Sequence, residues 1–290
     1  MSKDILSVIA ANAAHFSKGQ KRIAAYISNS YDKAAFITAN QLGQAVGVSE
    51  STVVRFAAEL GYDGYPGMQR ALQDMVRNKL TSIQRIEISN DRLGNQDILS
   101  QVIHSDVDRL RTTLEEVDRV SFEGAVDSIV KAKRIYILGV RSSSSIASFL
   151  GFYLNLMFDS VVLIHSNSVS EVFEQVFRIS PEDVFIGISF PRYSNRTAKT
   201  MQFAHDRGAT TIAITDNNGS PLSSFATYSL FAKSDMVSFL DSLVAPLSLV
   251  NALLAATAQK RMDKISRAFE TLEQIWEEYE VYTKSETDKG

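Results

Sequence analysis

The sequence predicts a two-domain protein, with an all-helical N-terminal domain and a C-terminal α/β domain built on a five-stranded parallel sheet. Three observations predict this division. Residues 1–80 have helical periodicity and no convincing strand. From Arg134 onward, short runs rich in Val and Ile alternate with helical stretches, which is typical of βαβ units and a parallel sheet. Between these parts, residues 81–96 are polar and lack an apolar period.

The N-terminal domain, residues 1–80, reads as several short helices. Glycine and proline at positions 61, 64, 66 and 67 interrupt them, and these residue types are strong breakers. This part holds nine Lys/Arg against six Asp/Glu, whereas the rest of the chain is acidic, so that the whole has a net charge of −3. The balance favours a negatively charged partner for the N-terminal part, although charge alone does not separate this interpretation from chance.

The linker, residues 81–96, ends in a plausible hinge at residues 90–95, and the C-terminal domain follows as residues 97–283. Its first segment, residues 97–131, is predicted to be helical from apolar positions close to a 3.6-residue period, namely Ile98, Val102, Ile103, Val107, Leu110 and Leu114.

Five β-rich runs define the predicted sheet. They are Arg134–Leu138, Val161–His165, Val184–Ser189, Thr211–Thr215 and Tyr228–Phe231. A helix is expected over Ser143–Phe158, with Ile146, Phe149, Leu150, Tyr153, Leu154 and Met157 on one stripe, and the last segment, residues 238–283, is also predicted to be helical.

The segment Thr38–Gly61 has the pattern of two short helices joined by a tight turn. Gly43 is small where two such helices would cross, and Gly47 can adopt the positive φ of the turn without steric cost. Ser49 is a favourable N-cap because its hydroxyl can accept a backbone N–H, and Gly61 is well placed to end the second helix. The positions expected to face inward are Leu42, Val46, Val48, Val53, Phe56 and Leu60. Together these features predict a helix-turn-helix.

Polar side chains remain near the start of the second helix: Ser49, Ser51, Thr52 and Arg55. In helix-turn-helix proteins this half of the helix enters the major groove. Hydroxyls suit phosphate oxygens, and an arginine suits the edge of guanine. We therefore predict that these four residues bind double-stranded DNA. The alternative is a plain helical hairpin with a solvated polar face, but the small residue, the glycine turn and the cap in register favour DNA binding.

The first β-run of the second domain leads into a serine-rich loop before a helix. Ser142, Ser143 and Ser144 offer hydroxyl donors there, Arg141 adds a positive charge, and the helix N-terminus offers free N–H groups. Open α/β sheets bind ligands at such strand ends. We predict that these four residues bind an anion. The alternative is that the serines only cap the helix.

Two further loops have similar chemistry. The third run leads into a loop with Ser189, Arg192 and Ser194, again before a helix. Thr215 ends the fourth run, and a turn-rich segment follows it. Because the ends of parallel strands share one edge of a sheet, we expect these four residues to join the same anion site.

The N-terminal segment resembles the DNA-binding domain of the RpiR family of bacterial regulators. The resemblance rests on Thr38–Leu72, and above all on VSESTVVRF (residues 48–56) and LGYDGYP (residues 60–66). In that family a sugar isomerase (SIS) domain follows, with three layers of helix, sheet and helix. The resemblance covers nearly the whole chain. It implies a transcription regulator controlled by a sugar phosphate, and a homodimer or homotetramer built through the SIS domains.

The two loops match SIS domains in part. The first loop of those domains has the form Gly-x-Gly-x-Ser, and the sequence has Gly139 and Ser143 at the first and last places, with Arg141 at the second glycine. The second loop has the form Ser-x-Ser-Gly-x-Ser/Thr. Here Ser189 and Ser194 match the ends, while residues 191 and 192, Pro and Arg, replace the central Ser-Gly. The added arginines suit a bisphosphate, a phosphorylated sugar acid, or a carboxylate on an unphosphorylated molecule.

The rival class is a sugar-phosphate isomerase with a helical N-terminal extension. Isomerisation needs a base to move a proton. Isomerases of this fold supply a glutamate and a histidine beyond the third loop, whereas this chain has no histidine after His205 and only Asp241 as a candidate there. His165 follows the second β-run, but a lone histidine is more often structural. We expect no enzymatic activity. A protein-binding SIS adaptor is a third class, which the helix-turn-helix argues against.

Composition excludes several other classes. The chain has no cysteine, which removes disulfides, thiol catalysis and thiolate metal sites and fits a reducing cytoplasm. The four histidines lack metal-ligand spacing. No apolar run is long enough to span a membrane, and no signal peptide is recognised. We expect a cytoplasmic protein with no cofactor, metal or membrane partner.

Overall fold

The computed structural model describes residues 5–79, 81, 83–86, 97–165, 168–236 and 240–281. By its contacts the chain divides into two compact units, Met1–Gly94 and Asn95–Gly290. The predicted hinge at residues 90–95 lies outside the described residues. The predicted domain limits of 1–80, 81–96 and 97–283 stay predictions.

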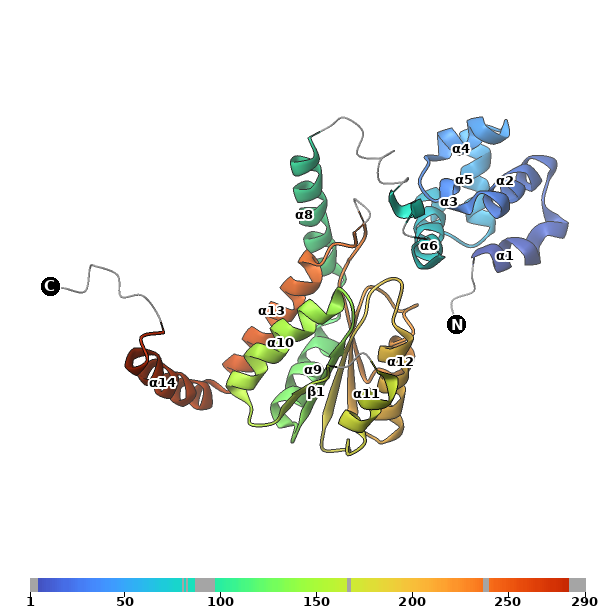
Figure 1. Cartoon of the computed structure of the whole chain (residues 1–290). Helices are drawn as coiled ribbons and strands as arrows, with labels where there is room; N and C mark the ends of the chain where they lie inside the picture. The colour runs from blue at the N-terminus through green and yellow to red at the C-terminus, as the bar shows by residue number, and fades with distance from the viewer. Residues whose placement is uncertain are drawn as a thin grey trace. The chain divides into compact units, whose positions relative to one another are not determined.

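Within residues 5–79 the N-terminal unit consists of helices joined by short turns (Figure 1). Its elements are α1 (Ile5–Asn12), a short 3-10 turn η1 (Ala13–His15), α2 (Lys18–Asn29), α3 (Tyr31–Ala34), α4 (Ala39–Val46), α5 (Glu50–Glu59) and α6 (Gly64–Lys79). Fully buried apolar side chains from five of these helices form its core: Ile23, Ile27, Ala34, Leu42, Val53, Phe56, Met68 and Leu72. Capping boxes at Ser17 and Thr38 fix where α2 and α4 begin.

The C-terminal unit is an α/β domain. Its elements are α8 (Ile98–Glu116), α9 (Arg119–Lys131), β1 (Ile135–Gly139), α10 (Ser143–Met157), β2 (Val161–Leu163), α11 (Val169–Val176), β3 (Val184–Ile188), α12 (Asn195–Asp206), β4 (Thr210–Thr215), η2 (Ser223–Phe225), β5 (Tyr228–Phe231), α13 (Val244–Gln259) and α14 (Met262–Glu278). The five strands form one parallel sheet in the order β2-β1-β3-β4-β5. This confirms the predicted parallel five-stranded sheet.

Helices cover both faces of the sheet, which gives three layers (Figure 1). Helices α9, α10 and α13 pack on one face, where alternate strand residues such as Ile137, Ile186 and Ile214 meet them. Helices α11 and α12 pack on the other face, against Leu138 and Phe185. Burial on both faces explains why β1 and β3 read as continuous apolar runs rather than as alternating ones.

Several predicted limits differ from the structure. β5 is as predicted. β3 and β4 differ by one residue at one end, and β1 differs by one residue at each end, whereas β2 ends at Leu163, two residues early. The predicted helical segment 238–283 is two helices, and α13 begins only at Val244. Residues 240–243 lie outside the helix, and Asp241 forms an isolated bridge with Met236. Residues 238–239 and 282–283 of that prediction lie outside the described residues.

Helix α8 is oriented unexpectedly. The predicted apolar stripe is mostly exposed, at 54% for Ile98, 53% for Ile103 and 62% for Leu114. The buried residues of α8 are polar instead, Arg109 and Thr113. A polar network explains this orientation: Asp106 binds both Arg109 (2.9 Å) and the hydroxyl of Ser242 (2.7 Å), while Thr113 accepts the backbone N–H of Lys233 (3.0 Å).

Candidate functional site

Helices α4 and α5 cross closely, as predicted for a helix-turn-helix. A Cβ on Gly43 would lie 2.7 Å from the backbone oxygen of Val48, so this position has no room for a side chain. Gly47 ends α4 with φ of 68°, in the left-handed conformation that glycine adopts freely. Val53 and Phe56 are fully buried, whereas Val46 and Val48 are only half-buried. The two glycines therefore set the geometry of the turn.

The four predicted DNA-binding residues form one cluster at the start of α5. The hydroxyl of Ser49 lies 2.9 Å from that of Ser51 and 2.8 Å from that of Thr52. Arg55 is exposed, and its Nε donates to the backbone oxygen of Ser51 (3.3 Å). Ser49 is the N-cap residue of α5, but its side chain makes no capping bond, which differs from the expectation. Its hydroxyl instead joins an exposed polar surface with Ser51 and Thr52.

The predicted anion-binding loops leave neighbouring strands at the same edge of the sheet. In the parallel register, Gly139 at the end of β1 is opposite Ile188 at the end of β3. Ile188 is in turn opposite Ile214 of β4. The chain order also reverses here, because β1 lies between β2 and β3 and the helices that follow β1 and β3 pack on opposite faces. Open α/β sheets bind ligands at such a switch point.

The first loop packs tightly around Gly139. A Cβ there would lie 2.5 Å from the backbone oxygen of Ser143, so glycine is required where β1 meets α10. Ser143 is 5% exposed and begins α10. Ser144 donates both its N–H (3.0 Å) and its hydroxyl (2.5 Å) to the backbone oxygen of Arg141. Ser142 is exposed and makes no capping bond. The side chains of Arg141 and Ser142 thus face solvent at the N-terminus of α10.

The second loop positions α12. Ser189 is 3% exposed, and its hydroxyl accepts the N–H of Ser194 (3.0 Å). Ser194 is the N-cap of α12, with its hydroxyl accepting the N–H of Thr197 (3.2 Å). Arg192 is exposed between the two serines. The hydroxyls of Ser189 and Ser194 therefore already have internal partners, and each keeps its own hydrogen to donate.

Sequence reasoning missed one hydroxyl in this loop. Thr197 is fully buried in the first turn of α12, and its Oγ1 has no hydrogen-bond partner among the described residues. Most buried hydroxyls have a hydrogen-bond partner, so Thr197 is an exception within this unit. The sequence could have indicated Thr197, because it lies in the first turn of the helix that follows a strand end.

The third loop joins the second through a buried carboxylate. The hydroxyl of Thr215 donates to the backbone oxygen of Ser189 (2.7 Å) and lies 2.8 Å from that of Ser220. The hydroxyl of Tyr193 donates to Asp216, which is 3% exposed (2.7 Å). Thr215 thus holds β4 to the end of β3. The Tyr193–Asp216 contact between two loops is not evident from the sequence, because it is a long-range pair.

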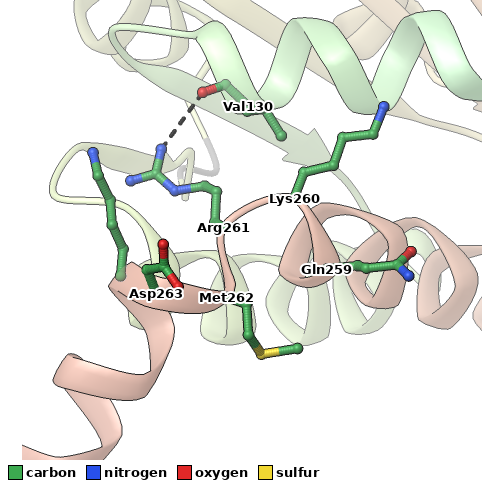
Figure 2. A pocket seen from close by; sticks show the side chains of 7 residues that line it. Val130, Gln259, Lys260, Arg261, Met262 and Asp263 are labelled. Atoms are coloured by element: carbon green, nitrogen blue, oxygen red, sulfur yellow. Dashed lines mark hydrogen bonds between the residues drawn. The ribbon is translucent and has the colours of Figure 1, made fainter.

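A cavity of about 410 Å³ lies away from these loops, where α13 meets α14 (Figure 2). Val130, which lines it, lies near the end of α9, the helix that leads into the start of β1, so the cavity is near the opposite edge of the sheet. Lys260 is paired with Asp127 (2.6 Å), and this hydrogen bond raises the pKa of Lys260 and lowers that of Asp127. Arg261 stacks on Phe158 (4.0 Å to the ring centre). Lys260 and Arg261, two of the cationic residues that line this cavity, therefore already have partners.

Neither a metal-ligand cluster nor a membrane-spanning helix is found in the described ranges. No group of three His, Cys, Asp or Glu residues there is arranged to hold a metal ion. No helix in the same ranges has the length and apolar character needed to cross a membrane. His165 is exposed, and Asp241 is half-buried in the bridge with Met236.

Comparison with protein families gives two matches. Residues 3–79 match the helix-turn-helix domain of the rpiR family, and residues 128–256 match the SIS domain. An HTH-type transcriptional regulator of Haemophilus influenzae is 29% identical over 234 residues, covering 79% of this chain and 80% of that protein. HexR of Escherichia coli, also an HTH-type transcriptional regulator, is 24% identical over 280 residues (93% and 95%).

Two solved structures resemble the fold. The sugar isomerase domain of an RpiR transcription factor from Sphaerobacter thermophilus has a TM-score of 0.58 and 29% identity, covering 62% of this chain and 99% of that one. The Vibrio vulnificus NanR protein complexed with ManNAc-6P has a TM-score of 0.58 and 25% identity, covering 93% of this chain and 97% of that one. The second match spans both units of the chain.

Proposed function

This chain belongs to the rpiR family of helix-turn-helix transcriptional regulators with an SIS domain, and we propose that a phosphorylated sugar or related anionic metabolite controls its DNA binding. One observation carries the proposal. The serine-bearing loops after β1 and β3 leave neighbouring strand ends at the point where the chain order reverses. The helix N-termini and hydroxyls there suit a phosphate group. The relative NanR, complexed with ManNAc-6P, supports this ligand class.

For DNA, we propose that the start of α5 enters the major groove. Ser49, Ser51 and Thr52 would contact phosphate oxygens, and Arg55 would read a guanine edge. The exposed hydroxyl cluster and the exposed guanidinium support this assignment. Because Arg55 also bonds to the backbone of Ser51, its side chain is partly ordered before DNA binds.

For the effector, we propose a site built by the first two loops. Ser142, Ser143 and Ser144 lie at the N-terminus of α10, and Ser189 and Ser194 lie before α12. Buried Ser143 and Ser189 are the residues on which we place most weight. Thr215 has a supporting role, since its hydroxyl is already bonded to the backbone of Ser189.

We propose that the SIS domain senses rather than isomerises its ligand. The relatives compared above are transcriptional regulators. An isomerase needs a base at the reacting carbons. Beyond the third loop the sequence offers Asp241 and no histidine, and Asp241 is half-buried in a backbone bridge. Incubation with common aldose and ketose phosphates should therefore give no exchange between them.

We further propose that the protein acts as a homodimer or homotetramer, since one helix-turn-helix reads few base pairs and dimers bind paired half-sites. The apolar residues of the α13 region divide into two sets. Leu249, Val250, Leu253 and Leu254 are buried core, whereas Leu240, Val244 and Leu247 are 36–60% exposed. The exposed set, with Phe152 and Tyr153 of α10, is the candidate subunit contact.

We propose that the effector regulates the protein through linkage between two equilibria, effector binding and DNA binding. The effector changes DNA affinity only as far as it binds two arrangements of the protein unequally. The test is a double variant, Ser143→Ala with Ser189→Ala, assayed by gel shift on the DNA upstream of the protein's own gene. We expect DNA binding to persist and the response to sugar phosphates to disappear. A response that survives in the variant would move the effector site elsewhere.

A further inference from the structure

Helix α14 has an apolar face that is mostly not buried. Its apolar residues recur at intervals of three and four, which places them on one side of the helix. Among the residues of α14, all of which the structure describes, only Ile265 is buried. Met262 is 57% exposed and Ile275 is 43% exposed, and Tyr279, which continues the face, is 71% exposed. The half-buried members of the face are Ala268, Phe269, Leu272 and Trp276.

Helix α14 is anchored at its start and leads away from its domain. Arg261, the residue before it, stacks on Phe158 at the end of α10 (4.0 Å to the ring centre), and Ile265 is buried near its start. From there α14, drawn in dark red, leads away from the layers of the C-terminal domain (Figure 1). An isolated helix of this length is marginally stable in water, and packing of an apolar face supplies most of a helix's stability. The domain covers this face fully only near its start.

The charged residues of α14 are unevenly distributed. Its first half has two acidic and two basic residues, whereas its second half has three acidic residues and no basic one. In chain order they are Asp263, Lys264, Arg267, Glu270, Glu273, Glu277 and Glu278. The C-terminus of a helix favours basic side chains, so acids there oppose the helix dipole. The distribution therefore does not stabilise α14 by itself.

Lys264 and Glu278 lie on the same flank of the apolar face, because 14 residues are close to four turns of a helix. Both are exposed, and neither has an ion-pair partner in the part of the chain that the structure describes. A second copy of α14, packed on this face in the opposite direction, would bring Lys264 of each copy beside Glu278 of the partner subunit. Packing in the same direction would place the two acidic halves together. Charge therefore favours the antiparallel arrangement.

We propose that α14 packs antiparallel against α14 of a second copy of this chain, through its apolar face. The inference rests on the proposed homodimer or homotetramer, and it adds a surface apart from the exposed residues of the α13 region and α10. Two copies related by a twofold axis use the same surface on both sides, so the contact closes and does not extend into fibres. It covers Ile275 and Tyr279 and gives the acidic half of each helix a basic neighbour.

The absence of cysteine from the chain makes cross-linking a specific test. Met262→Cys and Tyr279→Cys each place a single thiol at an exposed position of the face, and the two positions are 17 residues, or about 25 Å, apart along the helix axis. The full-length variants are co-expressed with distinguishable tags and treated with a short bismaleimide. We expect the co-expressed pair to form a cross-linked dimer of one copy of each, and either variant alone to give at least tenfold less.

Gln274→Cys is the matched control. Gln274 is also exposed, but it lies on the opposite side of α14 from Leu272 and Trp276. It should not form cross-links with Met262→Cys or with itself.

Charge exchange tests the direction of packing in a second way. Lys264→Glu or Glu278→Lys alone places like charges together at two symmetric contacts, so we expect the dissociation constant for self-association, measured by sedimentation at low ionic strength, to rise about tenfold. The double variant should restore it. An α14 without a partner helix predicts the reverse, because each single exchange improves the match to its own dipole.

The outcomes separate this inference from the proposed oligomer. A chain that sediments as a dimer or tetramer but gives no cross-link in the co-expressed pair overturns the inference and leaves the oligomer in place, since something else then covers the face. Equal cross-linking of each variant with itself, or single charge variants that associate as tightly as the wild type, also overturns it. A chain that sediments as a monomer would contradict both proposals.

Discussion

The turn between α4 and α5 and the loops at the sheet edge both use left-handed backbone, but they place different residues there. In the turn the residue is Gly47, with φ of 68°, and the polar side chains lie on the regular helix that follows. In the loops the residues are Arg141 and Arg192, so strain and candidate contacts coincide. The DNA-binding unit therefore separates residues that shape the backbone from residues that make contacts, whereas the loops combine the two roles.

The largest effect is expected at the crossing of α4 and α5. Gly43→Ala places a Cβ against the backbone oxygen of Val48, and backbone cannot move aside as a side chain can. We expect the free energy of unfolding of the N-terminal unit to fall by about 3 kcal/mol, at the upper end for overpacking. Thermal or urea unfolding measures it.

Gly67→Ala is the matched control, since a Cβ there, in the first turn of α6, meets its neighbours at 3.7 Å or more. It should leave stability unchanged or raise it slightly, because alanine favours helix over glycine. Equal stability of the two variants would contradict the close crossing of α4 and α5 at Gly43.

The next largest effect is expected at Arg55, a residue proposed to contact DNA without shaping the backbone. Arg55→Ala should lower affinity for the specific DNA by about 10- to 100-fold, or about 2 kcal/mol, since the arginine is proposed to read a base edge. The melting temperature should stay unchanged because the side chain is exposed. Gel shifts and thermal melts measure the two quantities. Unaltered DNA affinity would remove α5 as the recognition helix.

A smaller effect is expected at the turn itself. Gly47→Ala forces a Cβ into the left-handed region and should destabilise the N-terminal unit by about 1 kcal/mol. DNA affinity per folded molecule should be retained. Urea unfolding with DNA titration of the same sample tests this. A variant as stable as the wild type would show that the turn relaxes to another conformation.

The reverse substitution, to glycine at a left-handed position, should give the smallest effect. It should change the free energy of unfolding in the opposite direction. Arg141→Gly removes the Cβ from a left-handed position, so stability should stay equal or rise by up to about 1 kcal/mol. Calorimetric melting of the full chain measures the C-terminal transition. A marked loss of stability would mean that Arg141 serves the fold, so that the loops would not differ from the turn in this respect.

The sequence predicted the sheet well because its signals are local. Runs of Val and Ile flanked by breakers mark buried parallel strands whatever the rest of the chain does. The start of α13 was predicted too early because Leu240 and Leu243 continue an apolar period. Pro246, in the first turn of α13, was the better signal, since proline is tolerated at a helix start.

The orientation of α8 could not be predicted in the same way. Its apolar period is real, but periodicity does not say which side meets the domain. Buried Arg109 and the hydrogen bond from Ser242 to Asp106 decide it, and that bond joins residues 136 positions apart. Long-range polar pairs leave no pattern in a single sequence.

Within the candidate site, residue types were predictable and conformations were not. Serines and arginines after a strand and before a helix indicate an anion site directly. The positive φ of Arg141 and Arg192 needed the structure, since arginine alone gives no sign of it. The unpartnered hydroxyl of Thr197 likewise emerges only from packing.

An anion bound at the sheet edge is expected to change the affinity of the protein for DNA. The most direct test is a fluorescence anisotropy titration of the full chain on its own upstream DNA, with and without glucose 6-phosphate, 6-phosphogluconate, fructose 6-phosphate or fructose 1,6-bisphosphate. We predict that at least one phosphorylated compound shifts the DNA dissociation constant fivefold or more in the wild type and not in the Ser143→Ala, Ser189→Ala variant. A dissociation constant unmoved by a compound that calorimetry shows to bind would contradict the account.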